Sequence, residues 1–138
     1  MKIQAPFDAN IQLLSKVLDL RAQNQQVIGA NIANAETPGY APAKFEFEGQ
    51  LRQAIEQNKA MPMAAPNPGH FPLGPQNVAA IEGTITRTAD QTGIGDENGV
   101  SVETEMLALS ENQIMYEASA QLLQKKLSMI RYVISGGN

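Results

Sequence analysis

The chain has 138 residues, a formal net charge of −4 and no cysteine. Its length allows one domain with a modest core, and an aromatic content of only 5% does not indicate a large one. Ten scattered Lys and Arg residues form no basic stripe, which argues against nucleic-acid binding. The absence of cysteine excludes disulfides, zinc thiolates and thiol catalysis.

No stretch approaches the roughly 20 apolar residues of a membrane-spanning helix. The first residues, MKIQAPFDANIQLL, carry Gln4, Asp8 and Asn10 where a cleavable signal peptide needs an unbroken apolar run. We therefore expect a chain made in the cytoplasm without a cleavable signal peptide. Such a chain stays there or is exported by a machine that reads an uncleaved N-terminus.

The first predicted element is a helix from about residue 8 to residue 35, within an N-terminal region of residues 1–37. Asp8 is a natural N-cap, with Phe7 just outside it. Apolar residues recur at steps of three and four along one face, with Arg21 and Gln25 as a polar centre. The apolar members of this face are Phe7, Ile11, Leu14, Leu18, Ile28 and Ile32.

The sequence Thr37-Pro38-Gly39-Tyr40 predicts the end of this helix and a reversal of the chain. Proline moves the preceding residue out of the helical region. A type II turn needs proline at its second position and a residue with positive φ, usually glycine, at its third. Asn31 and Asn34, just before the turn, are poor helix formers. We expect them to hydrogen-bond neighbouring backbone at a crowded junction, either between this helix and the middle segment or between subunits.

Residues 38–100 form a middle segment of different character. A short helix is predicted within residues 44–60. Five prolines among residues 60–75 indicate an irregular or disordered loop. The β-branched stretch IEGTITRT, residues 81–88, favours a short strand or hairpin arm, and residues 89–99 form a second loop. The face expected to be apolar in the short helix contains Phe47, Leu51, Ala54 and Ile55.

The C-terminal segment, residues 101–138, carries the clearest pattern. Ser101 is a good N-cap, and Gly136-Gly137 ends the predicted helix. Steps of four and three run unbroken for more than four heptads, with only Gln113 polar, through Val102, Met106, Leu109, Gln113, Tyr116, Ala120, Leu123, Leu127, Ile130 and Ile134. A second, weaker apolar stripe on the same helix contains Leu107, Ile114, Leu122, Met129 and Val133.

These patterns predict a mainly α fold. Two long terminal amphipathic helices pair antiparallel as a coiled-coil-like hairpin, because neither can bury its apolar face alone. The Pro- and Gly-rich middle holds the short helix and at most a short β element. The predicted packing seam joins Ile11, Leu14, Leu18, Ile28 and Ile32 to Leu109, Tyr116, Leu123, Leu127 and Ile130.

The second stripe has no partner within such a hairpin, so we expect it to contact neighbouring subunits. Periodicity alone does not separate an intramolecular seam from an intersubunit one, and both readings of the primary seam remain open. It is also open whether the helices order only when neighbouring chains cover them.

Few residues suit an active site. His70, the only histidine, lies in the predicted loop, and no Ser-His-Asp arrangement can form without it. The polar cluster of Asp90, Asp96, Glu97 and Asn98 lacks the spacing of an EF-hand calcium loop. We therefore expect no catalytic residues, no metal or other cofactor, and no small-molecule substrate.

The stretch formed by Asn31, Ile32, Ala33 and Asn34 and the turn Thr37, Pro38, Gly39 and Tyr40 closely resembles the signature of flagellar basal-body rod and hook proteins. In that family it ends the N-terminal helix. The short chain, Asn98-Gly99-Val100 and Glu111-Asn112-Gln113 are similar to the small proximal rod proteins. The resemblance is strong over residues 10–50 and 98–138 and weak between them.

The resemblance implies a structural subunit of the proximal rod, whose terminal helices pack into a tube that crosses the periplasm and transmits motor torque. The implied partners are copies of itself, other rod proteins, the adapter that joins the rod to the membrane ring, and the flagellar type III export apparatus. Phe7 and Ile11 fit a short motif associated with recognition at the export gate, with core packing of Phe7 as the alternative. A different class of function is a soluble helical adaptor or export chaperone, which would stay cytoplasmic.

Overall fold

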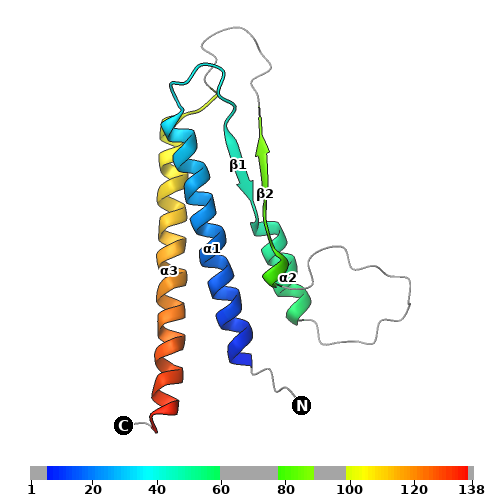
Figure 1. Ribbon diagram of the computed structural model, residues 1–138, viewed down its shortest axis with the longest axis vertical. Coiled ribbons are helices and arrows are strands. Elements are labelled where there is room, and N and C mark those ends of the chain that lie inside the picture. The colour runs from blue at the N-terminus through cyan, green and yellow to red at the C-terminus, as the bar shows by residue number, and fades with distance from the viewer. Residues whose placement is uncertain (1–5, 60–77, 89–98, 137–138) are drawn as a thin grey trace, which may run out of the picture.

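The computed structural model describes residues 6–59, 78–88 and 99–136. In chain order the elements are helix α1 (Pro6–Ala33), strand β1 (Ala43–Glu46), helix α2 (Glu48–Lys59), the short 3-10 helix η1 (Val78–Ala80), strand β2 (Thr84–Arg87) and helix α3 (Val102–Ile134). α1 and α3 run side by side and antiparallel, and α1 also contacts β1 and η1 (Figure 1). The predicted mainly α fold with a paired-helix hairpin is therefore confirmed. His70, the predicted loop at 60–75 and the acidic cluster at 90–98 lie outside the described residues.

The ends of α3 follow the expected capping chemistry. The Ser101 hydroxyl accepts a hydrogen bond from the backbone N–H of Thr104, and Glu103 and Glu105 lie in the first turn. Carboxylates there face the positive end of the helix dipole, which stabilises the helix start. At the other end Gly136 has a φ of 76°, the left-handed conformation that terminates many helices.

The predicted turn after α1 is present. The Tyr40 N–H donates to the Thr37 carbonyl at 3.2 Å, and Gly39 has a φ of 73°. This is the hydrogen bond and the positive φ at the third position that a type II turn requires. The turn sends the chain back alongside α1 into β1.

The short strand predicted within residues 81–88 is confirmed as β2, whereas its partner β1 in a two-stranded antiparallel sheet was not predicted. β1 pairs with β2 so that Phe45 lies opposite Ile85. The short helix expected within residues 44–60 is confirmed as α2 and begins at Glu48, because residues 44–46 before it are extended rather than helical. Alternation explains the difference, because Lys44 is exposed and Phe45 is buried within β1.

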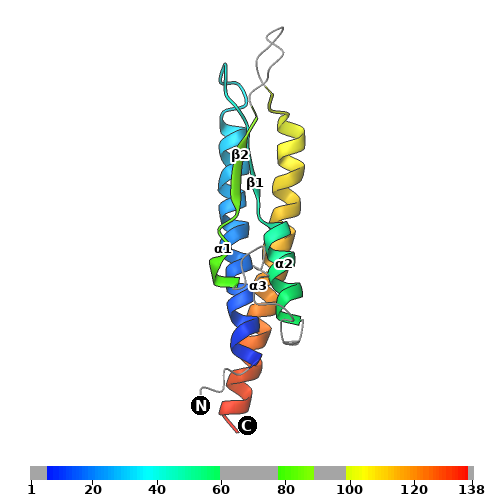
Figure 2. The same cartoon turned by 90° about the vertical axis from the view of Figure 1, so that its right-hand side faces the viewer.

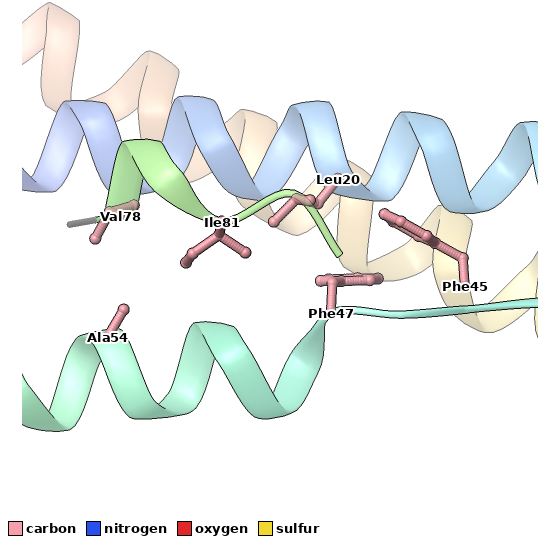
Figure 3. Close-up of a cluster of buried hydrophobic side chains, with 6 residues drawn as sticks. All are labelled: Leu20, Phe45, Phe47, Ala54, Val78 and Ile81. Carbon is pink, nitrogen blue, oxygen red and sulfur yellow. The ribbon is translucent and has the colours of Figure 1, made fainter. Parts of the chain in front are cut away.

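The largest cluster of buried apolar side chains lies between α1 and the middle segment, not between the two long helices. Figure 3 shows Leu20 of α1 converging with side chains from the middle segment, and the cluster contains Leu20, Phe45, Phe47, Ala54, Val78 and Ile81. Leu13 and Val27 pack against it, each seven residues from Leu20 on α1. α1 therefore buries two faces, one toward α3 and one toward the middle segment. The strands and α2 cover only one side of the helix pair (Figure 2).

Candidate functional site

The signature residue Asn31 lies at a junction of four segments and is only 2% exposed. Its amide nitrogen donates to the Ala43 carbonyl at 2.7 Å and to the Glu105 carboxylate at 3.1 Å. Its carbonyl oxygen accepts from the Ala43 N–H at 2.9 Å and from the Tyr40 hydroxyl at 3.2 Å. Both donors and both acceptor positions of the amide are thus used.

This arrangement joins parts of the chain that are far apart in sequence. The paired bonds to the Ala43 backbone imitate a strand partner and hold the first residue of β1 against the end of α1. The bond to Glu105 holds the first turns of α3 at the same place. A buried amide whose donors and acceptors are all hydrogen-bonded has a structural role, because none of its polar atoms is left to bind a ligand.

Asn34 has a different role from Asn31. Its amide nitrogen donates to the carbonyl of Ala30 one turn earlier at 2.8 Å, and its oxygen accepts from the Thr37 hydroxyl at 3.3 Å. Both bonds are local and close the exposed end of α1. Of the remaining signature residues, Ile32 and Tyr40 are half-buried, and Ala33, Thr37, Pro38 and Gly39 are exposed.

A second polar cluster lies where α1 and α3 cross near their middles. Asn112 of α3 is 3% exposed, and its amide nitrogen donates to the backbone carbonyl of Arg21 at 2.9 Å. Its oxygen accepts from Asn24 at 3.0 Å and from Arg21 at 3.5 Å. The sequence pattern indicated a polar centre at Arg21 and Gln25 on the first helix, and its only polar position in the stripe of the last helix was Gln113, not Asn112. Gln113 is exposed and bonds Glu117 instead.

Arg21 extends this cluster to the middle segment. Its guanidinium lies 3.2 Å from the Glu48 carboxylate and 5.2 Å from the centre of the Phe47 ring. The guanidinium therefore bridges α3, α1 and the start of α2. The buried Nε of Arg21 makes no hydrogen bond.

The residues of the predicted seam differ in how far they are buried. Ile28 is buried, and the half-buried seam residues are Ile11, Leu14, Leu18, Ile32, Leu109, Leu123 and Ile130. Tyr116 and Leu127 are exposed at 37% and 50%. Leu127 lines a groove of about 380 Å³ with Leu18 and Leu123, so the lower half of the helix pair is incompletely filled.

The second predicted stripe lies on the outward face of α3 and is exposed over its whole length. We call it the outer stripe; it consists of Leu107, Ile114, Leu122, Met129 and Val133, which are 63%, 63%, 56%, 49% and 76% exposed. Met106, Met115, Tyr132 and Ile134 on the same helix are also more than half exposed. A monomer rarely exposes a continuous apolar surface of this extent unless another molecule covers it.

The two residues of the predicted export motif lie at the start of α1. Ile11 is half-buried, and Phe7 belongs to the first turn, although its side chain is outside the described part of the chain. Among the described residues, no three Asp, Glu or His side chains gather where they could hold a metal ion. In the same residues, no helix combines the length and apolar character needed to cross a membrane.

Comparison with known proteins identifies relatives along almost the whole chain. A family model described as "Flagella basal body rod protein" matches residues 18–40, which include the turn and Asn31. The chain is 29% identical to "Flagellar basal body rod protein FlgB" of Salmonella typhimurium over 136 residues, covering 96% of this chain and 97% of that protein. The protein of the same name from Escherichia coli is 28% identical with the same coverage. That from Buchnera aphidicola is 30% identical over 122 residues, covering 88% of this chain and 90% of the relative.

Proposed function

Because this chain belongs to the flagellar basal body rod protein family, whose members are structural proteins and not enzymes, we propose that it is a subunit of the proximal rod. In this role it assembles with copies of itself and with other rod proteins through α1 and α3. The rod carries torque across the periplasm. The adapter between the rod and the membrane ring is a further partner.

The observation that carries this proposal is the exposed outer stripe of α3. Its large apolar side chains follow one face of a 33-residue helix. Burying an apolar side chain stabilises an assembly by about 1.5–3 kcal/mol relative to leaving it in water. A helix that exposes so many apolar side chains is therefore stabilised when neighbouring helices cover them.

The two buried polar clusters support the same role. Asn31 and Asn112 each make several hydrogen bonds between α1 and other segments. A buried amide fixes the register of two helices, because sliding them would leave its polar atoms unpaired. A subunit that transmits force needs such a fixed register, with its apolar contact surface left on the outside.

Export by the flagellar type III apparatus is part of the proposal. Phe7 and Ile11 fit the proposed recognition motif, and they lie at the beginning of α1, where the chain enters its first helix. In an unfolded chain during export both side chains are accessible. After assembly Ile11 packs against its own subunit.

Purified basal bodies test this function. A tagged full-length chain should co-purify with basal bodies, and a density map should contain its two paired helices within the rod. A soluble adaptor or chaperone would remain in the cytoplasmic fraction instead. Absence of the chain from basal bodies of cells that swim would refute the proposal.

A further inference from the structure

The charges on α3 are divided along its length. Its first 23 residues contain the carboxylates Glu103, Glu105, Glu111 and Glu117 and no Lys or Arg. The remainder contains Lys125, Lys126 and Arg131 and no Asp or Glu. The helix dipole favours this polarity at the two ends, but Glu111, Glu117 and Lys125 lie too far from the ends to gain from it.

Several of these charges border the outer stripe. At about 100° per residue, Glu103, Glu111 and Lys125 point within roughly 40° of Leu107. All four of these residues are exposed. Within the described part of the chain, no ion pair engages Glu103, Glu111 or Lys125. The charges are therefore available to a molecule that covers the stripe.

We propose that the outer stripe binds the outer stripe of a second copy of this chain, parallel to it and shifted along the helix axis by about five turns. This shift, about 18 residues or roughly 27 Å, lays the basic part of one α3 on the acidic part of the next. The inference rests on the proposed function, because it describes how neighbouring rod subunits contact one another.

The shift matches the apolar residues as well as the charges. Five turns of about 3.6 residues bring the same face of the helix back into position. Lys125 of one copy then lies beside Leu107 of the next, with its aliphatic stem on the leucine and its ammonium group between Glu103 and Glu111. In the same overlap Ile114 lies beside the neighbour's Tyr132 and Met115 lies beside its Val133, so exposed apolar side chains of the two helices meet there.

Other arrangements of two α3 helices fit the proposal less well. A parallel pair without a shift places like charges opposite one another, which is unfavourable. An antiparallel pair does match the charges, but it is two-fold symmetric and closes after two copies. A shifted parallel pair leaves the acidic part of one copy and the basic part of the other free, so the assembly can continue.

Cysteine cross-linking distinguishes these arrangements, because the natural chain has no cysteine. Ser110 and Ser128 are exposed on the outward face of α3, 18 residues apart. In basal bodies assembled from the full-length Ser110→Cys/Ser128→Cys variant, a short bismaleimide should give a ladder of dimers, trimers and longer chains. Each single variant is the control and should give no cross-linked product.

Two results overturn the proposed shift while leaving the proposed function intact. A covalent dimer without longer products indicates the antiparallel pair. Unlinked chains, in basal bodies that contain the variant, show that the two positions are not adjacent. If the wild-type chain itself is missing from basal bodies, the proposed function fails instead.

A charge-reversal pair provides a second measurement. Adding Lys125→Glu to the double-cysteine variant should lower the yield of cross-linked trimer by roughly threefold to fivefold, as expected for an exposed ion pair. Adding Glu111→Lys as well should restore the yield. No restoration, with unchanged helix content by circular dichroism, would contradict the predicted contact between Lys125 and the acidic part of the neighbouring helix.

Discussion

At the scale of single residues, Asn31 shows why the signature contains an amide near a helix end. A helix former such as leucine would fill the space but leave the Ala43 N–H and carbonyl without partners in a buried place. Unpaired buried backbone groups cost about 1–3 kcal/mol each. The sequence indicated a junction at both asparagines, but only Asn31 bonds distant segments, because Asn34 lies on the exposed side of the last turn.

Replacing Asn31 should therefore destabilise the fold far more than replacing Asn34. We expect Asn31→Ala to lower the free energy of unfolding by about 2–4 kcal/mol, since it removes both bonds to Ala43 and the bond to Glu105. Asn34→Ala, the matched control, should cost less than about 1 kcal/mol. Urea denaturation of the two variants checks this, and equal losses would contradict the assigned role of Asn31.

Gly83 is a second residue whose identity is dictated by its surroundings. It has a φ of 71°, and a Cβ atom there would overlap the Phe45 ring. We expect Gly83→Ala to destabilise the core between α1 and the middle segment by about 2 kcal/mol or more. Gly49→Ala is the control, because no atom lies within 4 Å of its added methyl group and its helix should become more stable by up to about 1 kcal/mol. Thermal unfolding compares them, and an unaffected Gly83→Ala melting temperature would be inconsistent with the described packing.

At the scale of elements, the two long helices could be predicted from sequence, but the face of α3 that meets α1 could not be fully predicted. The caps of α3, the turn after α1 and the long apolar period indicated these helices, but the predicted N-cap Asp8 is wrong, because α1 already begins at Pro6. The inward face of α3 carries Glu105, Ala108, Asn112 and Ser119. Because these residues are polar or small, a search for apolar spacing predicts a neighbouring face of α3 instead of the face that contacts α1. A period of 3.5 residues also drifts by about 20° per heptad from a straight helix.

The middle segment was harder to predict for a physical reason. β1 has only four residues, and 37 residues separate it from its partner β2. Phe45 of β1 and Phe47 just after it alternate with charged residues, but this alternation becomes informative only when α1 provides an apolar surface for both rings. That surface has a signal in the sequence of α1, because Leu13, Leu20 and Val27 are spaced seven residues apart on a face other than the predicted seam.

The polar crossing of α1 and α3 gives a test at this scale. We expect Asn112→Ala to lower the free energy of unfolding by about 2–3 kcal/mol, because Asn24, the Arg21 carbonyl and the Arg21 side chain all lose a partner. The neighbouring control Gln113→Ala should change stability by less than about 0.5 kcal/mol. Chemical denaturation followed by circular dichroism provides the measurement. If Gln113→Ala lowered the free energy of unfolding more than Asn112→Ala, Gln113 rather than Asn112 would face α1, as the sequence pattern predicted.

At the scale of the whole molecule, the residues that stabilise the monomer differ from the exposed residues that are available for assembly. The middle segment and α1 share the main apolar core, and the polar clusters fix α3 against α1. The outward face of α3 contributes to neither. The sequence alone could indicate the presence of a second stripe and, through the signature, the protein family. Which stripe faces outward depends on the packing of α3, which the apolar pattern leaves open.

If the outer stripe is the contact surface between rod subunits, Leu122→Asp should prevent assembly without unfolding the subunit. Leu122 is 56% exposed, so the purified variant should keep its helix content and stability. Leu123→Asp, one residue further and half-buried against α1, should instead unfold the helix pair. The decisive measurement is the amount of Leu122→Asp chain in purified basal bodies of cells that make only this variant. We expect no Leu122→Asp chain in the basal bodies and no swimming, whereas normal incorporation with normal motility would show that the outer stripe is not the contact surface.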